Sequence, residues 1–256
     1  IHLSRSHVEG GGTALLMQDV TAAQAAEASR RQFSANVSHE LRTPLTTISG
    51  YAELLSSGML QKPEDATEFG RKILAESRRL LTLIEDIIRL SRLDEGVRGE
   101  VTPVDLTALI QHCVQKLTPA AQNAQVSISA SGNDPVLISG DHALLEEMLT
   151  NLLENGIKYN HAGGYVRARA EMADGRAVVT VADNGVGIAP EDQQRVFERF
   201  YRVDKSRSKQ TGGTGLGLSI VKHGAQVHHA QIAMQSALGE GTTITLTFPA
   251  QSSVKK

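Results

Sequence analysis

One histidine in this chain, His39, has neighbours that suit chemistry at its imidazole ring. Apolar residues recur around it at steps of three and four, which predicts an amphipathic helix. At about 100° per residue, His39 projects about 160° away from the apolar stripe and is expected to face solvent. Glu40 is adjacent and could orient the ring or accept its proton, and Thr43 shares its face one turn later. The stripe consists of Phe33, Val37, Leu41, Leu45, Ile48, Ala52 and Leu55.

A proline follows this pair closely in the predicted helix. Pro44 cannot donate a hydrogen bond to the carbonyl of Glu40, so we expect it to loosen or bend the helix just after His39. The alternative is a surface histidine on an ordinary amphipathic helix. That alternative is the commoner explanation of a bare His-Glu pair, because short motif matches arise often by chance.

A second group of candidate residues lies on a helix predicted from Asp141 to about residue 160. Its polar side chains fall within an arc of about 100° around the helix. Amide oxygens are hard ligands that do not repel phosphate, and lysine adds positive charge, so the strip suits Mg²⁺ and a polyphosphate. A polar face that happens to contain asparagines explains the strip equally well on its own. The strip consists of Glu147, Asn151, Glu154, Asn155 and Lys158.

Two glycine-rich motifs follow. Residues 183–188, Asp-Asn-Gly-Val-Gly-Ile, come directly after a predicted strand, so a carboxylate stands at the strand end and glycines allow close backbone approach. Residues 212–218, Gly-Gly-Thr-Gly-Leu-Gly-Leu, precede a predicted helix whose amino end could hold phosphates. A flexible turn is the alternative for the second motif, which is neither a Walker loop nor a Rossmann fingerprint. Between the motifs, residues 196–207 mix aromatic and basic side chains and lose periodicity, which predicts a mobile lid.

Composition limits the class of protein. The net charge is -2 and basic residues are scattered among acidic ones, so no nucleic-acid partner is expected. The single cysteine, Cys113, leaves no intrachain disulfide and is expected to be a small core residue, which fits a reducing compartment. No apolar run approaches the roughly 18 residues that span a bilayer. Because the chain begins at Ile1 without a methionine, we expect a fragment, upstream of which a membrane segment could lie.

The elements that must position these residues divide into a thin helical part and a mixed part. Residues 1–20 contain a glycine cluster and one predicted strand from Ala14 to Val20, which is similar to the exit of a PAS sensory domain. Helical patterns then run from Thr21 to about Ser57 and from Pro63 to Gly96. This helical hairpin cannot bury both of its apolar stripes alone, so a second copy completing a dimeric four-helix bundle is expected.

After a short linker at 97–100, helices alternate with strands, which predicts an α+β sandwich. We expect Asp174-Gly175 to form a hairpin turn. The expected helices span 107–123, 141–160 and 214–228, and the expected strands span 126–131, 136–139, 165–172, 177–182 and 242–248.

Longer strings indicate a family. His39-Glu-Leu-Arg-Thr-Pro-Leu45 resembles the phosphoacceptor box of the two-component sensor histidine kinases, and by that resemblance His39 is phosphorylated. Four later strings resemble, in order, the N, G1, F and G2 boxes of the histidine-kinase ATPase domain, and the resemblance covers residues 25–250. The strings at 200–205 and 212–223 are most similar to the phosphate-sensing and cell-wall-sensing branch. The four boxes are Asn151–Asn155 with Lys158-Tyr159, Asp183–Gly187, Phe197–Phe200 and Gly213–Gly217.

The resemblance also implies roles for individual residues. Asn155 would ligate Mg²⁺, Asn151 and Lys158 would touch phosphates, Tyr159 would lie against the nucleotide, and Asp183 would accept the adenine amino group. Thr43 would position the water that hydrolyses a phospho-aspartate. Gly156 stands where alanine is usual, and His229-Ala230 replaces a common glycine pair. The remaining nucleotide-binding residues would be Gly185, Gly187, Arg202, Gly213, Thr214, Gly215, Leu216 and Gly217.

As a whole, the resemblance implies an enzyme that uses ATP and Mg²⁺ to phosphorylate His39 and passes the phosphoryl group to an aspartate of a response regulator. It would also act as a phosphatase on that regulator. Its domains would be the end of a PAS-like domain at 1–20, the dimerisation and phosphotransfer hairpin at 21–96, and the ATP-binding domain at 97–256. A domain movement must then bring nucleotide to His39. We expect a homodimer that forms the cytoplasmic portion of a membrane-anchored bacterial protein.

Two other classes of protein remain open at this point. A signalling scaffold could bind ATP without transferring its phosphate, and a labelled-ATP assay would separate it from a kinase. An ATPase of the same nucleotide fold, as in heat-shock or mismatch-repair clamps, would lack the histidine hairpin. A eukaryotic-type protein kinase is excluded because its Val-Ala-Ile-Lys, His-Arg-Asp and Asp-Phe-Gly strings are absent.

Overall fold

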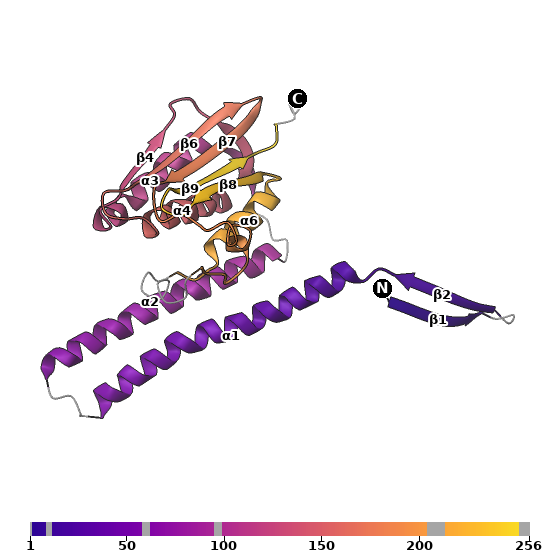
Figure 1. The fold of residues 1–256 in the computed structure, drawn as a ribbon, viewed down its shortest axis with the longest axis horizontal. Helices are drawn as coiled ribbons and strands as arrows, with labels where there is room; N and C mark the ends of the chain where they lie inside the picture. Colours follow the sequence, from indigo (N-terminus) through magenta and orange to yellow (C-terminus); the bar gives the residue numbers. More distant parts are fainter. Residues whose placement is uncertain (1, 9–11, 58–61, 95–98, 204–212, 251–256) are drawn as a thin grey trace. The chain divides into compact units, whose positions relative to one another are not determined.

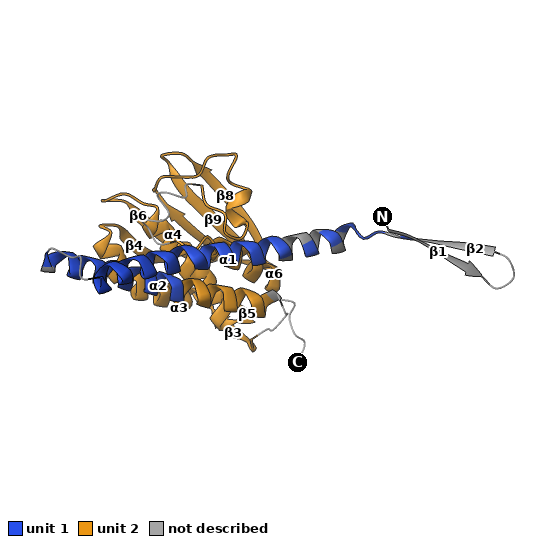
Figure 2. Cartoon of the chain, turned by 90° about the horizontal axis from the view of Figure 1, so that it is seen from below, with its two compact units in different colours: residues 1–81 blue, residues 82–256 orange. Residues whose placement is uncertain are grey.

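A computed structural model describes residues 2–8, 12–57, 62–94, 99–203 and 213–250 of the chain. They form two compact units, residues 1–81 and residues 82–256 (Figure 2). The boundary between the units falls inside a helix, whereas the sequence places the change of domain at residues 96 and 97. The division into three domains therefore stays a prediction.

The first unit begins with a β-hairpin. Strand β1, His2–Val8, pairs antiparallel with β2, Gly12–Gln18, and His2 lies opposite Gln18. The sequence predicted one strand here, from Ala14 to Val20, which corresponds to β2 with limits shifted by two residues, but it missed β1. The missed strand is largely polar, so it gives no apolar run to detect. Gly10 and Gly11, the expected turn, lie outside the described residues.

Two long helices follow, within two residues of the predicted limits. Helix α1, Thr21–Ser56, is 36 residues long, and α2, Pro63–Asp94, is 32 residues long (Figure 1). Helix α2 starts with proline at its first position and acidic residues in its first turn, both of which favour a helix start. Within the first unit, the rings of Tyr51 and Phe69 lie 5.1 Å apart, so the two helices form the expected hairpin.

The apolar stripe of α1 is only partly covered. Phe33, Val37 and Leu41 are half-buried, whereas Leu45 is 56% exposed and Ala52 is also exposed, contrary to the expectation that the whole stripe is buried. One neighbouring helix covers only one sector of α1, and these two residues lie outside that sector. Pro44 is buried and does not interrupt the helix.

The second unit is an α/β sandwich. Its five-stranded sheet has the order β4-β6-β7-β9-β8, with β4 parallel to β6 and every other neighbour antiparallel. Helices α3, α4 and α6 cover one face of this sheet (Figure 1). The strands are β4, Ser127–Ser131; β6, Tyr165–Ala173; β7, Arg176–Asp183; β8, Gln231–Ala237; and β9, Gly241–Thr247. The helices are α3, Leu106–Asn123; α4, His142–Lys158; and α6, Gly217–Val227.

Two further strands form a separate pair. Strand β3, Val101–Asp105, is antiparallel to β5, Leu137–Asp141. Each is followed directly by a helix, because the aspartate that ends the strand caps the helix amino end. Asp105 accepts a hydrogen bond from the Thr107 amide, and Asp141 accepts one from the Leu144 amide. These caps place the polar strip of α4 directly after β5.

The core of the second unit lies between the sheet and the three helices. Alternate residues of β6 point into it, and Cys113 of α3 is fully buried there, as predicted. Burying each large side chain in such a core contributes about 1.5–3 kcal/mol, so the sandwich gives α4 a rigid base. The described residues contain no helix that is both long and apolar enough to cross a bilayer.

Candidate phosphoacceptor and nucleotide-binding sites

His39 lies exposed on α1, as its position opposite the apolar stripe predicted. The Thr43 hydroxyl donates a hydrogen bond to the main-chain carbonyl of His39 at 3.2 Å. Thr43 is half-buried and lies one helical turn after the histidine. The structure thus brings these two candidate residues together at one surface of the first unit.

Glu40 is turned toward the second helix of the hairpin. One of its carboxylate oxygens lies 4.0 Å from a guanidinium nitrogen of Arg79 on α2. Arg79 also lies 3.6 Å from Glu76, so its guanidinium stands between two carboxylates. The sequence analysis missed Arg79, because the interaction depends on how α2 packs against α1 and not on spacing within either helix.

The strip on α4 meets the start of α6 at Asn151. The side-chain amide of Asn151 donates to the main-chain carbonyl of Glu147 at 3.0 Å, which leaves its oxygen directed toward Gly217. A Cβ atom on Gly217 would lie 2.6 Å from that oxygen, so only glycine allows this close approach. Asn155, one turn later, is half-buried on the same strip.

The carboxyl end of α4 meets the second glycine motif in the same way. A Cβ atom on Gly213 would collide with the ammonium nitrogen of Lys158 and would lie 3.3 Å from the Tyr159 hydroxyl. The Lys158 nitrogen is also 5.2 Å from the centre of the Tyr159 ring. The predicted strip and the predicted glycine motif therefore form one surface, with asparagine and lysine side chains facing main-chain groups.

Asp183 stands at the end of β7, at the other side of this surface. Its carboxylate accepts a hydrogen bond from the Gly185 amide at 2.8 Å. Burial raises the pKa of Asp183 above its ordinary value, against the lowering effect of that hydrogen bond. The Val186 amide donates to the Tyr159 carbonyl at 3.0 Å, which ties the motif containing Gly185 and Gly187 to the end of α4.

The segment between the two motifs is tied back to the second motif. The Phe200 amide donates to the Gly215 carbonyl at 2.8 Å, and Leu216 next to it is fully buried. Arg202, two residues beyond Phe200, is half-buried. The described part of the predicted lid ends at residue 203; its remaining residues and Gly212 lie outside the described residues.

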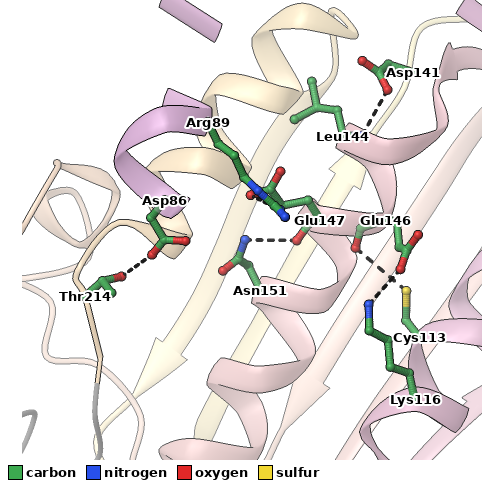
Figure 3. A network of polar contacts seen from close by, with 10 residues as sticks. All are labelled: Asp86, Arg89, Cys113, Lys116, Asp141, Leu144, Glu146, Glu147, Asn151 and Thr214. Carbon is green, nitrogen blue, oxygen red and sulfur yellow. Dashed lines mark hydrogen bonds and ion pairs between the residues drawn. The ribbon is translucent and has the colours of Figure 1, made fainter. Parts of the chain in front are cut away.

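Two further polar contacts reach this surface from residues 82–94 of α2, which belong to the second unit (Figure 3). The Thr214 hydroxyl donates to a carboxylate oxygen of Asp86 at 2.7 Å. Arg89 forms an ion pair of 2.9 Å with Glu147, the first residue of the strip. Sequence analysis missed both residues. The only available signal was a carboxylate interrupting an apolar face of α2 between Leu83 and Leu90.

Two protein-family models match the chain. The model described as "Histidine kinase-, DNA gyrase B-, and HSP90-like ATPase" matches residues 140–252, which contain the strip and both glycine motifs. The sandwich is therefore an ATP-binding domain of this type. The model described as "His Kinase A (phospho-acceptor) domain" matches residues 29–96, the helical hairpin that carries His39.

Relatives and solved structures agree with these models. The chain is 43% identical over 87% of its length to a sensor-like histidine kinase, SenX3, of Mycolicibacterium smegmatis, covering 58% of that protein. It is 39% identical over 93% of its length to the phosphate regulon sensor protein PhoR of Pseudomonas aeruginosa, covering 54% of it. The chain thus spans a little over half the length of these relatives. It belongs to the sensor histidine kinase family, and the phosphate-sensor relative agrees with the branch indicated by the sequence.

The fold agrees as well. Full-length ShkA in complex with AMPPNP gives a TM-score of 0.61 at 30% identity, over 84% of this chain and 45% of that one. The histidine kinase ThkA in complex with the response regulator protein TrrA gives a TM-score of 0.67 at 21% identity, over 99% of this chain and 75% of that one.

Proposed function

We propose that this chain is a kinase core that phosphorylates itself on His39 with ATP and then passes the phosphoryl group to an aspartate of a response regulator. The observation that carries the proposal is the meeting of Asn151 and Lys158 with the second glycine motif, in a chain whose hairpin presents His39 to solvent. Family membership makes an ATPase clamp without a phosphoacceptor the weaker explanation. A scaffold that binds ATP without transferring phosphate remains the competing one.

In the first step, a ring nitrogen of His39 attacks the γ-phosphorus of ATP, the bond to the ADP oxygen breaks, and the ring loses its proton. Such a transfer depends mainly on positioning and charge neutralisation. Lys158 and Arg202 would neutralise phosphate charge, and Tyr159 and Asp183 would hold the base. Glu40 would orient the ring or take its proton, a contribution that is typically about 10²- to 10⁴-fold.

The donor set fits a magnesium ion that is bound together with nucleotide. The described residues contain no cluster of three histidine, cysteine or acidic side chains suited to holding a metal alone. Mg²⁺ in such sites uses one or two protein oxygens together with substrate phosphates. The amide oxygen of Asn155 would provide such a ligand. When bound, the ion would neutralise the phosphate charge.

Partners follow from the same proposal. The ThkA structure described above is a complex with a response regulator protein, and we infer a receiver-domain partner of that kind for this chain. A second copy of the chain would cover the apolar residues that the hairpin leaves exposed. We also propose that the chain is the cytoplasmic portion of a membrane-anchored bacterial protein whose membrane segment lies upstream. Phosphatase activity on the regulator is our proposal for a second activity.

Incubation with γ-labelled ATP and Mg²⁺ tests the assignment. A phosphohistidine is a phosphoramidate, so the label should be lost in acid and survive alkali. His39→Gln should bind the ATP analogue AMPPNP as the parent does and take up no label. Asn155→Ala should take up no label because it binds no nucleotide. Label that is stable in acid, or that persists in His39→Gln, would contradict the proposal. AMPPNP binding without label in the parent would favour the scaffold.

A further inference from the structure

The last turns of α2 present one mixed face to the ATP-binding domain. Leu83 and Leu90 are 4% and 0% exposed, and Leu93 packs against the core of the second unit. Leu90 comes seven positions after Leu83, which is about two helical turns, so both lie on the same side of the helix. Asp86 lies three residues after Leu83 and four before Leu90, in the middle of this buried row.

An ionised carboxylate in that position loses hydration, and a hydrogen bond only partly offsets the loss. The Thr214 hydroxyl supplies one such bond at 2.7 Å (Figure 3). Burial raises the pKa of Asp86 above its ordinary value, and the neighbouring Glu147 raises it further. Placing the Asp86 carboxylate here therefore costs folding free energy, and packing alone does not explain why an aspartate stands at this position.

Arg89 makes a second contact one turn later. Its guanidinium pairs at 2.9 Å with Glu147, whose side chain is 14% exposed. Because Glu147 starts the strip and Thr214 lies in the second glycine motif, the two contacts hold α2 against both sides of the proposed nucleotide site. Asp86 also presents to Thr214 an anionic oxygen acceptor, which is the chemistry of a nucleotide phosphate oxygen.

We propose that Asp86 and Arg89 form a latch that competes with the nucleotide: Asp86 takes the place of a phosphate oxygen at Thr214, and Arg89 holds the helix closed through Glu147. This inference rests on the proposed function, which assigns Thr214 to phosphate binding. A phosphate and the Asp86 carboxylate repel each other and cannot share one hydroxyl donor, so bound nucleotide requires an open latch. The measured affinity for nucleotide is then reduced by the fraction of open molecules.

Isothermal titration of AMPPNP with Mg²⁺ tests the latch in four forms of the chain: the parent, Asp86→Ala, Arg89→Gln and Glu85→Gln. If about nine in ten molecules are closed, opening the latch should tighten binding about tenfold in both Asp86→Ala and Arg89→Gln. Glu85→Gln removes a neighbouring exposed carboxylate and should bind as the parent does.

Arg89→Gln separates the latch from simple charge. This change removes a positive charge near the phosphates, so electrostatics alone would weaken nucleotide binding, whereas opening the latch strengthens it. Unchanged or weaker binding by Arg89→Gln would overturn the proposal, even if Asp86→Ala bound more tightly. Absence of AMPPNP binding in the parent and in all variants would instead overturn the proposed function itself.

Hydrogen exchange gives a second readout that does not depend on substitutions. Adding AMPPNP and Mg²⁺ to the parent should increase amide exchange in residues 82–94, because nucleotide displaces this part of α2. Unchanged exchange in those residues at saturating nucleotide would overturn the latch while leaving nucleotide binding intact.

Discussion

The residues beside His39 take different partners. The Thr43 hydroxyl donates a hydrogen bond to the His39 carbonyl on the same helix, whereas the Glu40 carboxylate forms an ion pair with Arg79 on α2. Thr43 therefore stays beside the exposed histidine, whereas the orientation of Glu40 depends on how α2 packs against α1.

Thr43→Ala should keep autophosphorylation and lose most of any phosphatase activity, because the hydroxyl that would position the hydrolytic water is removed. Thr46→Ala is the matched control. The Thr46 hydroxyl donates the same kind of hydrogen bond, to the main-chain carbonyl four residues earlier, that of Arg42, at 2.9 Å on an exposed turn. Thr46→Ala should therefore alter neither activity. The measurements are label uptake from γ-labelled ATP and loss of label from a phosphorylated regulator. Equal loss of both activities in Thr43→Ala would point to damage of the helix near Pro44.

Whether a single residue could be predicted depended on how far apart in the sequence it and its partner lie. The exposure of His39 follows from the periodicity of its own helix, so the sequence revealed it. The strip from Asn151 to Lys158 was visible for the same reason. Asp86 was not visible, because its partner Thr214 lies 128 residues away and the contact exists only after distant elements pack together.

Among the elements, the long helices, the central strands β6, β7 and β9, and the edge strands β4 and β5 were predictable, whereas β3 and β8 were missed. Strand β3 contains Pro103, which argues against a strand, yet β3 belongs to a two-stranded sheet in which a proline at an edge is tolerated. Strand β8 lies at the edge of the main sheet and alternates only between exposed and half-buried residues. Its apolar signal is correspondingly weak.

Replacing each of two helical glycines with alanine should have different effects on stability. A Cβ atom on Gly70 of α2 meets nothing within 4 Å, so Gly70→Ala should raise the free energy of unfolding by about 1 kcal/mol through the lower entropy of the unfolded chain. A Cβ atom on Gly156 of α4 would lie 3.0 Å from both methyl groups of Val166, which is fully buried and stiff. Gly156→Ala should therefore gain nothing or lose stability.

Urea unfolding followed by circular dichroism measures both effects, with separate fits where the two units unfold separately. A gain of about 1 kcal/mol in both variants would show that Val166 moves aside without cost. In that case packing would not explain why glycine stands at position 156, where the family resemblance leads one to expect alanine.

At the scale of the whole molecule, α2 carries an exposed apolar row with the spacing of a helical interface. Leu74, Leu81 and Ile88 recur every seven residues and are 50%, 60% and 48% exposed. Seven residues correspond to about two turns, so the three side chains lie along one face, as in helical bundles. A second copy of the chain is the partner that our proposal assigns to this face.

If the chain forms the proposed dimer, Leu81→Glu should convert it to a monomer, because a carboxylate would be buried at the centre of the row without a partner. Leu81→Met, which keeps volume and apolar character, is the control and should remain dimeric. Light scattering after size-exclusion chromatography measures the mass of each variant. A dimer that survives Leu81→Glu at low micromolar concentration would place the interface elsewhere on the hairpin.

Helix α2 runs without interruption from Pro63 to Asp94, and the boundary between the compact units divides it at residues 81 and 82. A loop at such a boundary would absorb a rotation through its flexible backbone. A continuous helix, whose turns are hydrogen-bonded to one another, transmits rotation about its axis from one end to the other. It follows that an axial twist applied near Leu74 also turns Asp86 and Arg89 about the same axis. A rotation of about 30° would move side-chain ends by several ångströms, enough to separate a hydrogen bond or an ion pair. Under the proposed latch, rotation of this one helix would therefore change access to the proposed nucleotide site.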